Sequence, residues 1–193
     1  MDKLLDVTMN FLYRNEEGMN AEQAEIVRYG LELLFLKASF FAATMIIGIL
    51  MRSFWECLVF TLLLSGIRTT AGGFHASTRM KCFIMSMLTF TIVLIILKMV
   101  DIYNIILLPL TILALLSAMI IWKFSPIDTE NKPLEEGEYA IFRKKARTML
   151  FFEIGVAITA YLLGLLGVAC SVLLALIITG LLMTAELFKK IRK

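Results

Sequence analysis

Long runs of mainly apolar residues constrain the fold of this chain more than any other feature. An apolar α-helix of about 20 residues spans the roughly 30 Å hydrocarbon core of a membrane. Hydrophobic residues make up 60% of the 193 residues, compared with roughly 45–50% in soluble domains. We therefore predict an all-α, polytopic membrane protein. Its six transmembrane helices are expected at 33–51, 54–67, 83–97, 102–122, 149–166 and 168–187.

Lysine and arginine alternate between rich and poor loops, and this alternation predicts the orientation of the chain. The rich segments are 1–30, 68–82, 123–147 and the carboxy terminus, whereas the turn at 164–167 has no charge. Because basic loops stay in the cytoplasm, we expect both termini and the two rich loops on the cytoplasmic side. Residues 1–193 then form one membrane domain. The net charge of +3 reflects this topology and requires no nucleic-acid partner.

Two short features complete the predicted layout. Segment 1–30 contains helical periodicity at 3–13 and is expected to form a cytoplasmic interfacial segment. Membrane lipids or a substrate helix are its expected partners. The last two spans are expected to join through a tight hairpin, because Gly164 and Gly167 tolerate the positive φ of a close turn.

The polar island at 68–82 contains the chain's single histidine, His75, and ends at Cys82. The flanking spans have about 14 and 15 residues, which cover only about 21–23 Å at 1.5 Å per residue. Such short spans would draw the island into the membrane. Irregular backbone is tolerated there only within protein or a water-filled cavity. We therefore predict a recessed active site on the cytoplasmic side.

His75 and Cys82 suggest nucleophilic chemistry, because an imidazole can take the proton of a thiol. In one straight helix they would lie about 10 Å apart along the axis. A catalytic pair therefore requires a break, which Gly72 and Gly73 can supply. The alternative is an interfacial histidine beside a buried thiol.

A metal site is not expected. Zinc needs three or four ligands, and Cys57 and Cys170 fall toward the opposite face of the membrane. These two cysteines are interpreted as packing residues, and the sequence predicts no metal and no cofactor.

Two motifs resemble those of a known family. The first runs from Arg68 through Ala-Gly-Gly and His75 to Cys82, followed by Ser86. The second is Ser-Pro-Ile-Asp-Thr-Glu-Asn-Lys-Pro-Leu at 125–134. Together with the chain length and the span count, they resemble the AgrB (accessory gene regulator B) family of Gram-positive quorum-sensing systems. The resemblance covers nearly the whole chain.

The resemblance implies a cysteine endopeptidase of the cell membrane of a Gram-positive bacterium, with an AgrD-like propeptide as its substrate. It assigns catalysis to His75 and Cys82. The enzyme would remove the acidic tail of the propeptide and hold the remainder as a thioester. An internal thiol or hydroxyl of the substrate would then displace it as a cyclic thiolactone or lactone.

Other residues are candidates for oxyanion or substrate binding. Arg68 could hold a carboxylate or an oxyanion, and the amides of Gly72 and Gly73 could do the latter. Ser86 and Lys132 are further candidates, since the basic loop suits an acidic peptide tail. The alternatives are a positive-inside anchor for Arg68, a simple turn for the glycines, and anionic lipid for the basic loop.

Several alternatives remain open from the sequence. A small peptide transporter would use the loop around His75 as a gate, although a transporter should carry charges near the bilayer midplane. A noncatalytic scaffold is a third reading. Glu153 lies inside the fifth span and is a candidate for a third catalytic residue. A homodimer is compatible with the sequence.

Overall fold

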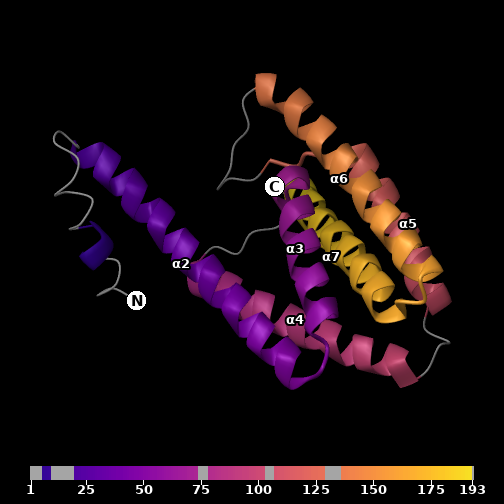
Figure 1. Ribbon diagram of the computed structural model, residues 1–193. Helices are drawn as coiled ribbons and strands as arrows, with labels where there is room; N and C mark the ends of the chain where they lie inside the picture. Colours follow the sequence, from indigo (N-terminus) through magenta and orange to yellow (C-terminus); the bar gives the residue numbers. More distant parts are fainter. Residues whose placement is uncertain (1–5, 10–19, 74–77, 103–106, 129–135, 193) are drawn as a thin grey trace. The chain divides into compact units, whose positions relative to one another are not determined.

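The computed structural model describes residues 6–9, 20–73, 78–102, 107–128 and 136–192. Apart from a short helical segment at 6–9, these residues form six long helices (Figure 1). The six helices are α2 (Ala21–Leu50), α3 (Phe54–Ala71), α4 (Arg79–Ile102), α5 (Leu107–Phe124), α6 (Glu136–Leu162) and α7 (Leu166–Ile191). The predicted all-α class is confirmed.

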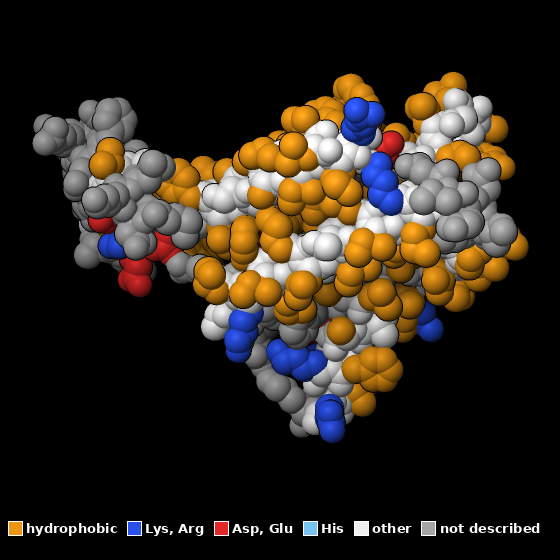
Figure 2. Space-filling model, turned by 90° about the horizontal axis from the view of Figure 1, so that it is seen from below, with side chains coloured by type: hydrophobic (Ala, Val, Ile, Leu, Met, Phe, Trp, Pro, Cys, Tyr) orange, Lys and Arg blue, Asp and Glu red, His pale blue; other side chains and the backbone are white. Residues whose placement is uncertain are grey.

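Five of these helices are long and apolar enough to cross a membrane: α2, α3, α4, α5 and α7. Large apolar side chains stay exposed along them, and Figure 2 shows such side chains over much of one face. The protein is therefore a polytopic membrane protein. The predicted span at 149–166 falls on α6, where Arg147 and Glu153 interrupt the apolar sequence. A sixth span stays a prediction.

The chain divides into two compact units, Met1–Ala43 and Thr44–Lys193. In the first unit, the start of α2 is fixed by a reciprocal cap. The Gln23 amide donates to Asn20 Oδ1 at 2.8 Å, and the Asn20 amide donates to Gln23 Oε1 at 3.2 Å. Because this cap starts the helix at Ala21, residues 21–30 belong to the same continuous helix as the first predicted span. The predicted interfacial role of segment 1–30 stays a prediction.

Helix α7 forms the core of the second unit. It packs against α3, α5, α6 and α4, and about half of its 26 residues are buried. Small residues permit close helix contacts in membranes. At Gly180 a Cβ would lie only 2.6 Å from Ser117 Cβ on α5. Gly180 thus sets the distance between α5 and α7.

The turn between α6 and α7 has the tight geometry expected from its glycine. Gly164 has a φ of 74°, and the amide of Leu165 donates to the carbonyl oxygen of Ala160 at 2.9 Å. This pattern ends a helix without leaving its last carbonyls unpaired. The predicted hairpin is confirmed, although the turn ends at Leu165 rather than at Gly167.

Helices α3 and α4 are longer than predicted. They have 18 and 24 residues, which correspond to about 27 Å and 36 Å. Polar residues extend them: the Thr69 hydroxyl donates to the Ser65 carbonyl at 2.6 Å and stays within the helix. The expectation of two short spans is wrong: α3 continues to Ala71 and α4 begins at Arg79, so both ends of the expected loop at 68–82 are helical. Short helices therefore cannot be the reason for a recessed site at residues 68–82.

We predict that Gly180→Ala destabilises the bundle by about 1–3 kcal/mol, because the added methyl group would overlap Ser117. Thermal unfolding of the detergent-purified protein would measure this. The matched control is Gly155→Ala, where a Cβ meets no atom within 4 Å. That variant should be neutral or slightly stabilised. Equal stability of the two variants would contradict the proposed close contact between α5 and α7.

Candidate functional site

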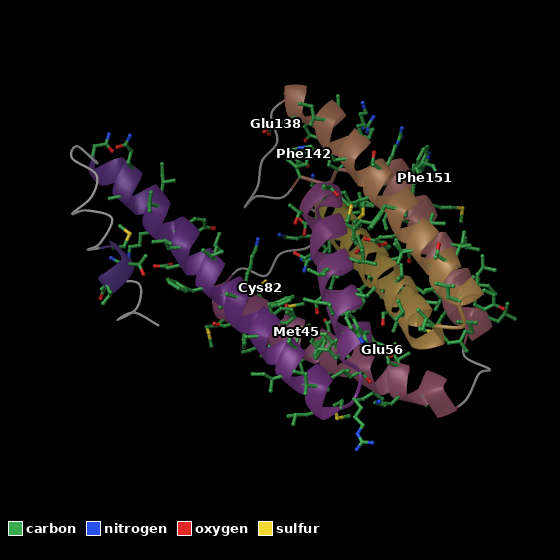
Figure 3. All side chains as sticks on the ribbon, in the orientation of Figure 1. Met45, Glu56, Cys82, Glu138, Phe142 and Phe151 are labelled. Carbon is green, nitrogen blue, oxygen red and sulfur yellow. The ribbon has the colours of Figure 1, made fainter. Side chains whose placement is uncertain are left out.

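Cys82 lies near the amino-terminal end of α4 and is partly exposed (Figure 3). Thr78 begins this helix: its hydroxyl oxygen accepts from the Lys81 amide at 3.3 Å, and its carbonyl oxygen accepts from the Cys82 amide at 3.0 Å. The amino terminus of a helix favours negative charge nearby. The sulfur therefore occupies a position suited to a nucleophile. Cys57 and Cys170 are buried.

Arg68 lies in the last turn of α3. Its positive charge acts on Cys82 through a coulombic interaction. A guanidinium carries a permanent positive charge and several donors. It can therefore stabilise negative charge that develops beside the sulfur. The two residues are 14 positions apart in the sequence, one in the last turn of α3 and the other in the first turn of α4.

The predicted break at the glycines is confirmed. Helix α3 ends at Ala71, and Gly72 and Gly73 have φ values of 78° and 123°. The amide of Gly72 donates to the Arg68 carbonyl at 3.1 Å. That amide is thus used to close the helix and is not an oxyanion donor. His75 lies outside the described residues, so its distance from Cys82 stays a prediction.

The second motif meets the first at this break. The Ile127 amide donates to the Ala71 carbonyl at 2.9 Å, and Gly72 and Ile127 form a parallel β-bridge. A Cβ at Gly72 would overlap the Ile127 carbonyl oxygen. Glycine is therefore required there both by the positive φ and by the close approach. Ser125 and Ile127 are buried, so the segment that leaves α3 at Gly72 packs against protein.

Helices α6 and α7 hold the second motif in place. Arg143 Nε of α6 donates to the Ser125 carbonyl at 3.3 Å. Lys190 of α7 donates to Asp128, which also accepts a hydrogen bond from Tyr139. The bond from Lys190 holds the pKa of Asp128 below its usual range, and the bond from Tyr139 acts in the same direction. Asp128 is thus ionised and paired at neutral pH.

The basic segment at 123–147 is only partly a loop, which corrects the sequence prediction. Helix α6 begins at Glu136, so the cluster from Arg143 to Arg147 is helical. Arg147 Nη2 donates to the Trp122 carbonyl at 3.4 Å. The Arg147 guanidinium also lies 4.3 Å from the centroid of the Trp122 ring. Cations near the end of a helix satisfy its last carbonyls. Arg143 and Arg147 therefore cap the end of α5 rather than simply facing an acidic peptide.

The other sequence candidates are less closely connected to Cys82. Ser86 follows it by one turn of α4 and is partly exposed, whereas Lys132 lies outside the described residues. Glu153 is fully buried, and no described residue hydrogen-bonds its carboxylate. Nothing among the described contacts links Glu153 to the cysteine. Within the described part of the chain, no three His, Cys, Asp or Glu side chains gather to hold a metal.

One end of the second unit carries all the interacting parts of the site. The end of α3, the end of α5, the start of α6 and the end of α7 meet there through the contacts at Ala71, Ser125 and Asp128. At the opposite end of the unit, the starts of α3 and α7 also approach closely: a Cβ at Gly167 of α7 would lie 2.8 Å from Glu56 Oε1 of α3. The two motifs and the carboxy-terminal end of α7 thus lie at the same end of this unit, and the side of the membrane that this end faces stays a prediction.

Fold and site together define a multi-pass membrane protein with a cysteine and an arginine at one end of a helical bundle. The family model for accessory gene regulator B matches residues 6–185, and the chain belongs to this AgrB family. An AgrB-like protein of Clostridium perfringens (strain SM101 / Type A) is 27% identical over 173 residues, covering 85% of this chain and 80% of the relative. A comparison with solved structures gave no match. The family resemblance predicted from the two motifs is confirmed.

Sequence reasoning missed the role of Asp128 and Lys190. Asp128 was part of the second motif but had no assigned contact. Lys190 is 62 residues away and was interpreted only as a topological charge. No spacing in the sequence pairs these two residues, because their contact depends on how α5 and α7 pack.

Proposed function

We propose that this protein is a membrane cysteine endopeptidase that cleaves the acidic carboxy-terminal tail from an AgrD-type propeptide and prepares the remainder for cyclisation. Family membership supports this, because AgrB proteins are peptidases that process AgrD in quorum sensing. It also favours a peptidase over a peptide exporter or a noncatalytic scaffold. The observation in the structure that supports the assignment is the helix break between the two motif residues, with Arg68 in the last turn of α3 and a partly exposed Cys82 in the first turn of α4.

Cys82 is the proposed nucleophile and His75 the proposed base. His75 takes the thiol proton while the sulfur attacks the carbonyl carbon of the scissile peptide bond. The C–N bond then breaks, and His75 returns the proton to the departing amine of the tail. The product is a thioester between Cys82 and the shortened peptide. A thiol or hydroxyl of the substrate then attacks the thioester carbonyl carbon, and its proton passes through His75 to the Cys82 sulfur. The bond between that carbon and the Cys82 sulfur breaks as the ring closes.

Arg68 and the glycine segment have supporting roles in this scheme. Arg68 stabilises the oxyanion of the tetrahedral intermediates or binds a carboxylate of the substrate. Gly73 is retained as an oxyanion candidate, whereas Gly72 closes α3. Ser86 and Lys132 are proposed substrate contacts, and Lys132 suits an acidic tail.

Exclusion of water decides whether the thioester cyclises or hydrolyses. Exchange of one thioester for another changes the free energy little, so the substrate nucleophile must be held close while water is kept away. Coverage by protein supports this requirement: Gly73 and Ile127 are buried where the connection leaves α3. Packing by the second motif thus replaces short helices as the proposed source of the recess.

We predict that Cys82→Ala abolishes cleavage of a propeptide that carries an amphipathic helix, a central cysteine and an acidic tail. The protein would be reconstituted in nanodiscs and the products followed by mass spectrometry. Wild-type protein should form a covalent adduct at Cys82 with the mass of the shortened peptide. Cys57→Ala and Cys170→Ala are the controls and should cleave normally. Cleavage by Cys82→Ala at the wild-type rate would rule out this nucleophile.

We further propose six spans with the site on the cytoplasmic side. The abundance of Lys and Arg near the two motifs and the carboxy terminus supports this orientation. In this scheme α6 crosses the membrane after its basic first turns. The hairpin at Leu163–Leu165 then faces outward, as does the turn at Arg52.

Topology can be tested with single cysteines in a background without Cys57, Cys82 and Cys170. An impermeant maleimide should label Arg52→Cys and Leu163→Cys in intact cells, because both residues are exposed in turns. Lys145→Cys should be labelled only after the cells are opened. Labelling of Lys145→Cys and Leu163→Cys from the same side would show that α6 does not cross.

A further inference from the structure

Gly72 and Gly73 begin the segment that joins α3 to Cys82, which we call the catalytic connection. The second motif lies between this segment and the helices α6 and α7. On one side, Ile127 donates its amide to Ala71 and pairs with Gly72. On the other side, Asp128 binds Lys190 near the end of α7 and Tyr139 in the first turns of α6. Because Ile127 and Asp128 are adjacent in the chain, a displacement of Asp128 would also displace Ile127 from its contact with α3.

Helix α7 supports both partners of this contact. A Cβ at Gly73 would lie 3.4 Å from the backbone carbonyl carbon of Leu182, so the connection runs close to the α7 backbone. Two turns later, Lys190 holds Asp128. The same helix thus fixes the start of the catalytic connection and the segment that pairs with it.

We propose that Asp128 is a positioning residue: its contacts with Lys190 and Tyr139 hold Ile127 against Ala71 and Gly72, and so fix the connection that leads to Cys82. This proposal rests on the proposed function, because the property that it affects is the reactivity of Cys82. Asp128 does not contact the substrate in this account. We call Asp128, Lys190 and Tyr139 the latch.

The solvent exposure of the latch residues predicts whether their loss affects the stability of the whole bundle or only the local structure. The side chains of Asp128 and Lys190 have relative exposures of 35% and 46%. Ion pairs this exposed contribute little to global stability. Loss of the latch should therefore leave the bundle folded and change only the local arrangement of the second motif. Slower chemistry with unchanged substrate binding would distinguish positioning from a general structural role.

The test compares Asp128→Asn, Lys190→Gln and the double variant in nanodiscs with the AgrD-type propeptide. Each single variant should lower kcat about fivefold with little change in KM, the scale expected for a partly exposed pair. The double variant should be no slower than either single variant, because both remove the same contact. Arg192→Gln is the matched control, since it removes a charge from the same end of α7. It should retain the wild-type kcat.

Single variants with wild-type kcat would overturn the latch, as would effects that multiply in the double variant. If Asp128→Asn fails to accumulate, Tyr139→Phe decides, because it removes only a hydroxyl group. A lowered kcat in Tyr139→Phe supports the latch, and an unchanged kcat overturns it. Cys82→Ala is assayed in parallel: if it cleaves, the proposed function fails, whereas wild-type kcat in the latch variants beside an inactive Cys82→Ala refutes the latch alone.

Discussion

The hydrogen bond from the Ile127 amide to the Ala71 carbonyl is the contact on which the candidate site depends. Backbone groups that leave a helix inside a membrane protein need partners, because lipid offers none. Helix α3 ends at Ala71, and its last carbonyls must be satisfied at that point. The second motif satisfies one of them, and Gly72 permits the approach because it has no side chain. Two motifs that are distant in the chain thereby form one structural unit.

Around that contact, charged side chains act mainly as helix caps and positioning groups. Arg143 and Arg147 bind carbonyls at the end of α5, and Lys190 binds Asp128. The basic residues that predict orientation thus also have specific contacts at the same end of the bundle. Arg68 differs from them because it belongs to the first motif, at the end of α3.

Much of this architecture could be predicted from the sequence, for local physical reasons. Apolar runs located the helices, and Gly72 and Gly73 located the break, because both depend on neighbouring residues. Helix ends were predicted less well, since polar residues such as Thr69 extend a helix by bonding to its own carbonyls. The contact between Gly72 and Ile127 and the pair between Asp128 and Lys190 could not be predicted. They depend on how α3, α5 and α7 pack, which no spacing in the sequence records.

The most direct test of this account is the hydrogen exchange of the Ile127 amide, measured by NMR in nanodiscs for wild-type protein and Gly72→Ala. We expect strong protection in the wild type, because the amide is bonded to Ala71 in a buried segment. In Gly72→Ala the added methyl group would separate the two motifs, so exchange should be at least about tenfold faster. Gly155→Ala should match the wild type. Rapid exchange in the wild type, or equal protection in Gly72→Ala, would contradict the claim that this contact builds the site.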